Sequence, residues 1–477
     1  MIAWGPREKE PLWNGKPAPW YKQKKKLWIL IGVCTVLLII IIIREGAEAA
    51  RDSESGLGGV SPDSIPKGAP SWLNPFVWED TADFNLTYTD ETVGGLPLMG
   101  LDTEWDDSAK ANDHVPALEK PWGDYAKRPA RGVNVGGWLS LEPFITPSLF
   151  NYDLRMGISV LEKHYATFVT EDTFREIRDA GLDHVRIPFS YWAVEVYDGD
   201  PYVFRTSWRY LLRAIEWCRR YGLRVNLDVH GLPGSQNGWN HSGRLGPINW
   251  LNGTDGALWG KRALEFHDSL SKFFAQPRYK NIISHYGLAN EPKMTFLDSQ
   301  EVLQWTTDAH ALVRKNGVSD AIVVFGDGFR GLHNWQGELQ GLDRAALDVH
   351  QYVIFNTGQI VFNHTAKVRY ATGFGPTLVA EWSQADDTDC AKHLTNVGWG
   401  TVGPARNSCS CEEANAPVSE WSDSYKQFLR MFAEAQIPQW SYKKGLAAGV
   451  LPAKAYERSF DCDLSDIPSF SDLPETY

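Results

Sequence analysis

The sequence predicts an α/β protein whose main part is a (β/α)8 TIM barrel, in which parallel strands alternate with helices. The first observation is that short apolar, β-branched runs alternate with longer segments of helical spacing from residue 132 onward. The second is that polar and charged residues follow those runs, at the strand ends where such a barrel carries its functional groups. A doubly wound open sheet is the alternative, but no glycine-rich phosphate-binding turn opens a helix.

The strands and helices of the barrel can be placed in order along the chain. Short apolar runs bounded by polar residues predict strands at 132–139, 184–189, 223–230, 282–288, 321–325, 347–352 and 377–382. Apolar residues that recur every three or four positions predict helices at 171–180, 207–221, 257–275, 299–315 and 419–435. This regular alternation is what repeated βα units require.

Three segments precede the barrel domain, which we place at 128–477. Residues 1–26 form a polar tail that closes with several lysines, and 27–43 form an uninterrupted apolar run, about the minimum length for a membrane-spanning helix. Because the basic residues come before the run, we expect a single-pass type II anchor in the cell membrane, with the barrel outside the cell. Residues 44–127 are rich in Gly, Pro, Ser and Asp and predict a stalk or linker.

A cleaved signal peptide is the alternative to the anchor. Residues 47–49, Ala-Glu-Ala, offer a small-x-small cleavage site. Both interpretations place the rest of the chain in the secretory lumen or outside the cell. Glycosylation sequons at Asn85, Asn240, Asn252 and Asn363 are compatible with that compartment.

The composition limits the classes of partner. A net charge of −12 argues against nucleic acid and against a basic membrane-binding surface. The 21 tryptophans suit both a packed core and a surface that stacks sugar rings. Of the six cysteines, Cys34 lies in the apolar run, so an odd number remains and at least one thiol stays free or pairs outside the chain. We expect a monomer with no cofactor.

Two glutamates end predicted strands. Glu291 follows the strand at 282–288, and Glu381 lies in the strand at 377–382. Both should therefore lie at the same end of the barrel. Glycoside hydrolysis needs such a pair, with one carboxyl to protonate the leaving oxygen and one to attack or to activate water. The alternative, that both glutamates are structural partners in salt bridges, stays open at this point.

Further polar residues fall at or just past strand ends: Arg186, His230, Asn290, His350 and Tyr352. Any one of them could be an ordinary structural hydrogen-bonding residue, but five in register with two glutamates favour a sugar site. We predict no metal site, since no Cys/His/Asp spacing around His230 or His350 supports a closed one. A serine triad is also unsupported, because no Gly-x-Ser-x-Gly motif occurs.

Longer motifs resemble a known family. Together they are similar to fungal exo-β-1,3-glucanases of glycoside hydrolase family 5, and the resemblance covers about residues 128–462. The segments that carry it are 131–150, 230–239, 290–292, 350–352, 381–383 and 388–390.

This resemblance implies a retaining double displacement, with Glu381 as the nucleophile and Glu291 as the general acid/base. Asn290 would hold the 2-hydroxyl of the reacting glucose, and Arg186 would keep the nucleophile ionised. His350 and Tyr352 would orient the nucleophile. His230 and Glu142 would line the glucose subsite. The acid then needs a raised pKa and the nucleophile a lowered one, with the carboxyl groups about 5 to 5.5 Å apart.

The chain departs from the family pattern in three places. Trp239 and Asn240 stand where the family has phenylalanine and aspartate, so an aromatic ring is kept while a carboxylate becomes an amide or a glycan acceptor. No apolar run matches the eighth strand, and 445–451 is a poor substitute, so we expect that strand to be missing or degenerate. The cysteine pattern is kept only in part, at Cys390 with Cys409 or Cys411 and at Cys462.

The expected function is that of a membrane-anchored glycoside hydrolase that releases glucose from the ends of β-1,3-glucans during cell-wall remodelling. Two alternatives remain. A non-catalytic glucan-binding paralogue would fit the missing strand. A glucan transglycosylase would fit a retaining mechanism, because the glycosyl intermediate can pass to a sugar instead of water.

Overall fold

The computed structural model describes residues 91–98, 104–142, 158–352 and 376–383, apart from residues 126 and 244. It also describes short pieces at 145–146, 149, 420, 422–423, 445–446, 449 and 451–457. Several predicted features lie outside these residues: the tail 1–26, the apolar run 27–43, most of the linker and of the helix 419–435, the sequons at Asn85 and Asn363, and all cysteines except Cys218. None of the helices in the described part combines the length and hydropathy needed to cross a membrane.

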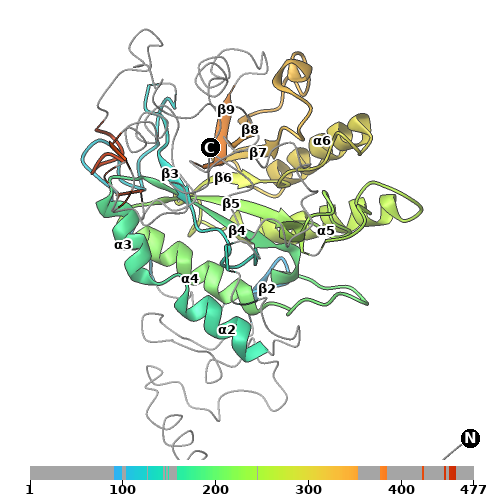
Figure 1. Cartoon of the computed structure of the whole chain (residues 1–477), viewed down its shortest axis with the longest axis horizontal. Coiled ribbons are helices and arrows are strands. Elements are labelled where there is room, and N and C mark those ends of the chain that lie inside the picture. Colours follow the sequence, from blue (N-terminus) through green and yellow to red (C-terminus); the bar gives the residue numbers. More distant parts are fainter. Residues whose placement is uncertain are drawn as a thin grey trace, which may run out of the picture. The chain divides into compact units, whose positions relative to one another are not determined.

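Seven parallel strands form the central sheet and pair in the order in which they occur in the chain (Figure 1). They are β3 (Gly132–Asn134), β4 (His184–Ser190), β5 (Arg224–Gly231), β6 (Ile283–Gly287), β7 (Ile322–Gly326), β8 (Ala345–Tyr352) and β9 (Thr377–Ser383). This order confirms the predicted (β/α)8 architecture, with seven of its strands in the described part of the chain.

The two edge strands of this sheet, β3 and β9, lie close to each other. The side-chain nitrogen of Asn134 on β3 donates a hydrogen bond to the carbonyl oxygen of Ala380 on β9, at 2.7 Å. The sheet is therefore nearly closed. No eighth strand pairs with either edge among the described residues, which agrees with the prediction from sequence.

Helices lie around the outside of the sheet: α2 (Ile158–Thr167), α3 (Glu171–Asp179), α4 (Thr206–Tyr221), α5 (Gly256–Phe274) and α6 (Ser299–Lys315). Local chemistry sets their ends. Asp298 caps α6 by accepting hydrogen bonds from the backbone nitrogens of Gln300 and Glu301. Gly222 ends α4 in the left-handed conformation, with a φ of 69°. The remaining short elements are β1 (Thr92–Val93), β2 (Leu96–Pro97), η5 (Tyr191–Ala193), η6 (Asn240–Ser242) and η7 (Leu332–Trp335).

Two elements of the barrel differ from the prediction. The first strand was expected over 132–139 but ends at Asn134. The chain turns at Gly137, whose φ is 66° and where a Cβ atom would lie 2.6 Å from Ile145. Helix α2 was not predicted, because its first turn holds β-branched residues that favour strands. The strands β4 to β9 and the helices α3 to α6 begin and end within two residues of their predicted bounds, whereas β1, β2 and the three short η helices were not predicted.

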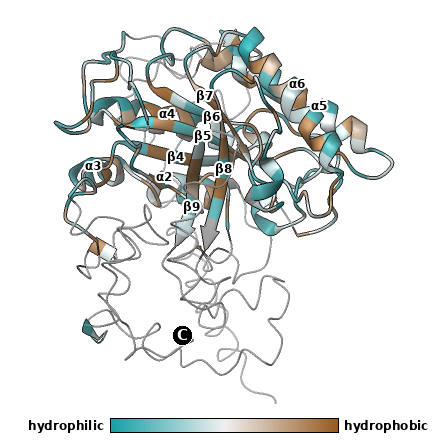
Figure 2. Ribbon diagram, turned by 90° about the horizontal axis from the view of Figure 1, so that it is seen from above, coloured by the Kyte–Doolittle hydropathy of each residue, from teal (hydrophilic) through white to brown (hydrophobic). Residues whose placement is uncertain are grey.

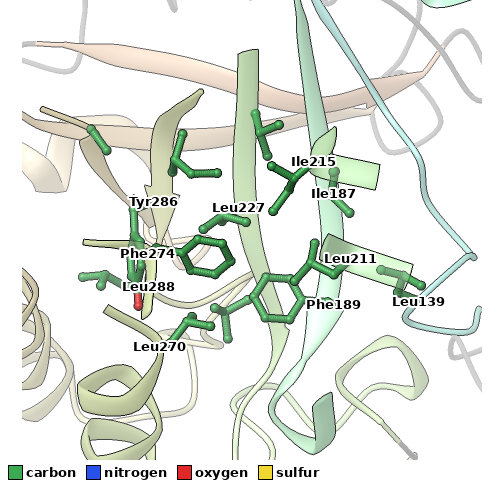
Figure 3. Close-up of a cluster of buried hydrophobic side chains, with 14 of the residues drawn as sticks. Leu139, Ile187, Phe189, Leu211, Ile215, Leu227, Leu270, Phe274, Tyr286 and Leu288 are labelled. Carbon is green, nitrogen blue, oxygen red and sulfur yellow. The ribbon is translucent and has the colours of Figure 1, made fainter. Parts of the chain in front are cut away.

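Side chains alternate between two environments along β4 and β5. The apolar ones are fully buried against the helices: Val185, Ile187, Phe189, Val225, Leu227 and Val229. Figure 3 shows several of them packed with Leu211 and Ile215 of α4 and with Leu270 and Phe274 of α5. Burial of each such side chain contributes about 1.5–3 kcal/mol. Because successive side chains point to opposite faces, the polar residues between them line the inside of the barrel.

Hydropathy follows this division. In Figure 2 the central strands carry the hydrophobic stretches, whereas α5 and α6 alternate between hydrophobic and hydrophilic residues. Such alternation is expected of helices that pack one face on a sheet and expose the other.

Residues 104–122, which we call the N-terminal strap, pack against the domain. The sequence predicts a linker here, yet Leu118 and Trp122 are buried in the core. The carboxylate of Asp107 forms a buried ion pair with Arg219 and accepts a hydrogen bond from Asn281, at 2.9 Å. The side chain of Asn112 donates to the carbonyl oxygen of Gly181. These contacts precede β4, β5 and β6, so the strap lies at the amino ends of the strands.

Candidate active site

Arg186 on β4 is the centre of the polar interior. One guanidinium nitrogen contacts Glu381 at 2.5 Å and Asn134 at 3.2 Å. The other donates to the side-chain oxygen of Asn290 at 2.9 Å and lies 3.1 Å from Asp228. Burial alone would lower the pKa of Arg186, but the carboxylates around it raise that pKa, so the side chain stays charged. Side chains from β3, β5 and β9, and Asn290 just past β6, thus converge on one guanidinium.

Glu381 on β9 is held as a carboxylate. Its second oxygen lies 3.3 Å from Nδ1 of His350, and its side chain is 14% exposed. Burial would raise the pKa of Glu381, but His350 and Arg186 lower it to about 2. The sequence predicted an ionised group beside Arg186, and the geometry has this arrangement. A carboxylate that is ionised and partly exposed can act as a nucleophile.

Glu291 lies just past β6, where its φ of 47° turns the chain. Each of its carboxylate oxygens faces a histidine: Oε1 lies 2.7 Å from Nδ1 of His350, and Oε2 lies 2.8 Å from Nε2 of His241. Burial would raise the pKa of Glu291, but the two histidines hold it well below its usual value. The sequence-based expectation of a raised pKa for Glu291 is therefore wrong, because two imidazoles stabilise the ionised form.

The two carboxylates stand close together. One oxygen from each lies within 4.8 Å of the other, with His350 between them. His350 also contacts Asp348, at 3.3 Å from Nε2. Burial would lower the pKa of His350, but Glu381 and Asp348 raise it well above its usual value. The histidine is therefore a cation that links three acidic side chains.

His230 and Glu142 lie on another side of the same cluster. Nδ1 of His230 is 2.7 Å from Asp228, and Nε2 is 4.0 Å from Glu142. Burial opposes the charge on His230, but Asp228 raises its pKa to about 9. Burial raises the pKa of Glu142, partly offset by His230 and His241. A buried polar wall of this kind is able to hydrogen-bond sugar hydroxyls.

The loop after β5 supports Asn290 and Glu291. The side-chain amide of Gln236 donates to the carbonyl oxygens of His230 and Asn290, at 2.9 and 2.8 Å. The side chain of Asn237 donates to the carbonyl oxygen of Glu291 at 3.2 Å. Gln236 and Asn237 are both buried, so the loop fixes the backbone that carries the acid/base candidate.

Trp239 and Asn240 follow in this loop. The ring of Trp239 contacts Phe329 edge-on at 5.5 Å, and Lys293 lies 5.1 Å from its centroid. Both polar side-chain atoms of Asn240 are buried, with no hydrogen-bond partner among the described residues. The nitrogen that would carry a glycan is thus enclosed. Tyr352 is the last residue of β8, and its side chain lies outside the described part.

Sequence reasoning missed several members of the cluster: Asn134, Asp228, His241, Asp327 and Asp348. A signal for two of them existed, since Asp228 and Asp348 each stand two residues before a predicted site histidine and therefore share its face of the strand. Asp327 follows β7, and its burial raises its pKa to about 6. Nothing in the local pattern marked His241.

Two sets of three side chains could approach a cation together: Asp228, His230 and Glu381, and Glu291, His350 and Glu381. Both sets share Glu381, which is already 2.5 Å from the guanidinium of Arg186. A metal ion at either place would stand beside a fixed positive charge, so the donor set fits a metal poorly.

Comparison with known proteins decides the family. The family model described as "Cellulase (glycosyl hydrolase family 5)" matches residues 148–428, more than half of the chain. The chain belongs to glycoside hydrolase family 5. Within this family, Glu291 and Glu381 occupy the ends of barrel strands, where glycosidases carry their carboxylates.

Two relatives have sequences similar to that of this chain. "Probable glucan 1,3-beta-glucosidase D" of Aspergillus fumigatus is 50% identical over 549 residues, which cover 97% of this chain and 65% of that protein. The protein of the same name in Aspergillus flavus is 53% identical over 494 residues, covering 89% of this chain and 59% of that protein. The chain therefore spans less than two-thirds of the length of these relatives.

Proposed function

We propose that the chain is a retaining glycoside hydrolase that releases glucose from the ends of β-1,3-glucans. The observation that carries the proposal is the pair of carboxylates, Glu291 and Glu381, with oxygens within 4.8 Å of each other. The carboxyl groups of retaining enzymes stand about 5–5.5 Å apart, whereas those of inverting enzymes stand about 6.5–9.5 Å apart to admit a water molecule, so oxygens this close favour a retaining enzyme. The names of the relatives support the choice of a β-1,3-glucan.

In the first step, an oxygen of Glu381 attacks the anomeric carbon of the terminal glucose. The bond from that carbon to the glycosidic oxygen breaks, and Glu291 gives its proton to this oxygen. In the second step, Glu291 takes a proton from water, and the resulting hydroxide displaces Glu381 from the anomeric carbon. Arg186 stays 2.5 Å from Glu381 and stabilises the negative charge that Glu381 regains when it leaves the anomeric carbon.

The remaining site residues would bind the sugar. Asn290, fixed by Arg186 at 2.9 Å, has a side-chain nitrogen that is buried and without a partner among the described residues. This free donor is available for a glucose hydroxyl, and His230 and Glu142 offer further polar atoms nearby. The half-buried ring of Trp239 offers a face for stacking.

Glucose release from a linear β-1,3-glucan tests the proposal. The full chain should release glucose, while Glu381→Ala and Glu291→Gln should each lower the rate by at least about 100-fold. Glu265→Gln, an exposed change on α5, is the matched control and should keep the parent rate. A parent protein that melts cooperatively but releases no glucose would refute the proposal and favour a non-catalytic glucan-binding protein.

We propose further that residues 27–43 anchor the chain in the cell membrane with the barrel outside, where it acts on cell-wall glucan. The support is the apolar run preceded by lysines. Protease added to intact cells that lack a wall should digest the barrel and spare the amino-terminal tail. Protection of the barrel would refute this topology.

A further inference from the structure

His241 takes part in a contact for which the proposed mechanism gives no role. It belongs to η6, is 5% exposed, and directs Nε2 to Oε2 of Glu291 at 2.8 Å. The other oxygen of Glu291 faces His350 at 2.7 Å. Both oxygens therefore accept from imidazole groups, and neither carries the proton that a general acid must donate.

His350 is poorly suited to supply that proton. Its Nδ1 is shared between Glu291 and Glu381, and its Nε2 faces Asp348 at 3.3 Å. If His350 gave its proton to Glu291, the carboxylates of Glu381 and Asp348 would face a neutral ring. In a buried cluster this change is costly, because both carboxylates would lose part of their compensation.

His241 has simpler surroundings. Among the ion pairs of the described residues, His241 contacts one carboxylate, that of Glu291. The amide of Asn237 lies 3.3 Å from Nε2, and the rings of His230 and Trp239 are 5.6 and 5.4 Å away. The titratable groups that act on it are Glu291 after β6, His230 on β5 and Glu142 after β3.

We propose that His241 is a positioning residue that stores the proton which Glu291 gives to the leaving oxygen. The inference rests on the proposed function. As glucan binds, the proton on Nε2 of His241 passes to Oε2 of Glu291, so the imidazolium becomes neutral imidazole and the carboxylate becomes a carboxyl group. That carboxyl group then protonates the glycosidic oxygen as the bond to the anomeric carbon breaks. The proton that Glu291 later takes from water restores the pair.

The test is His241→Gln, with His333→Gln on exposed η7 as the matched control. Glutamine keeps an N–H donor near the position of Nε2 but cannot carry the transferable proton. At about pH 7 the variant should lose about 10- to 100-fold in kcat/KM on β-1,3-glucan, whose leaving group needs an acid. On a dinitrophenyl β-glucoside, whose leaving group needs almost none, it should stay within about threefold of the parent.

The pH profile separates this role from a purely structural one. In His241→Gln, the proton for the leaving oxygen must be carried by Glu291 itself, whose pKa is lowered by His350. The basic limb of the pH profile of kcat/KM on glucan should therefore move to lower pH. The control should keep the parent profile. An unchanged basic limb, or equal losses on both substrates, would overturn the proposal.

A measurement without turnover keeps the two proposals distinct. In chain labelled with nitrogen-15 at histidine, NMR at the pH of the activity assay should find both ring nitrogens of His241 protonated. Glu291→Gln should make His241 lose this proton at lower pH than in the parent. The signals are assigned as those absent from His241→Gln or His241→Asn. A neutral His241 would overturn the proton-store proposal, whereas an inactive parent with these NMR properties would refute only the hydrolase function.

Discussion

Replacement of Arg186 by lysine should destabilise the domain while keeping the charge. The guanidinium uses two nitrogens for four contacts within 3.2 Å, with Glu381, Asn134, Asn290 and Asp228. Lysine has one nitrogen, so we expect about two of these contacts to be lost. Hydrogen bonds to charged groups contribute about 1.5–3 kcal/mol each, which gives a loss of about 3–6 kcal/mol. This is a large share of a typical stability of about 5–15 kcal/mol.

Thermal unfolding followed by circular dichroism measures this loss. A domain of roughly 350 residues has an unfolding entropy of about 0.7 kcal/mol/K, so Tm should fall by about 4–8 °C. Arg175→Lys is the control, because Arg175 makes only an exposed ion pair with Asp172, and its Tm should stay within about 1 °C. If Arg186→Lys also melts within about 1 °C of the parent, the contacts around the guanidinium do not hold the barrel together as argued.

Two further predictions concern pH and the N-terminal strap. Since the pKa of Glu381 is lowered from 4.5 to about 2 in the folded state, its contribution to stability is present above about pH 4.5 and is lost as the pH falls toward 2. Glu381→Gln should therefore flatten the dependence of Tm on pH in this window, and an unchanged slope would contradict the assigned cause. Gly222→Ala should cost about 2–4 kcal/mol, because a Cβ atom there would lie 2.3 Å from Lys110 of the strap and φ is positive. Gly253→Ala, at a φ of 72° with open space around it, should cost only about 1–2 kcal/mol, and equal losses for the two glycines would show that the strap is not packed there.

The fold could be predicted where local pattern and tertiary environment agree. The strands β4 to β9 are apolar runs that end in polar residues, and burial against helices is what such runs require. The packing of the strap against the domain was not predicted, because its sequence has no periodic pattern. It packs through isolated side chains, such as Leu118 and Trp122, and through the ion pair of Asp107 with Arg219. Contacts between distant parts of the chain leave no periodic signal.

The residue types of the candidate site could be predicted from the sequence, whereas their pKa values could not. Placing Glu291, Glu381 and Arg186 at strand ends needed only the strand pattern. The lowered pKa of Glu291 depends on His241, which comes from a short loop helix and approaches in three dimensions alone. A pKa depends on all neighbours within a few ångströms, so the sequence of one strand does not determine it.

The position of the N-terminal strap has a mechanical consequence. The strap joins the barrel at the amino ends of the strands, whereas the carboxylates Glu291 and Glu381 lie at the carboxyl ends. Residues 91–98 also contact the outside of the barrel: Leu96 is buried, and Trp208 of α4 donates to the carbonyl oxygen of Pro97. Tension applied to the chain before residue 91 would therefore reach α4 first, and the ion pair between Asp107 and Arg219 only after these contacts had broken. The side chains that would bind a sugar take no part in these contacts. A domain pulled from its amino terminus would thus be loaded at its outer helices and at the strap before the carboxylates Glu291 and Glu381.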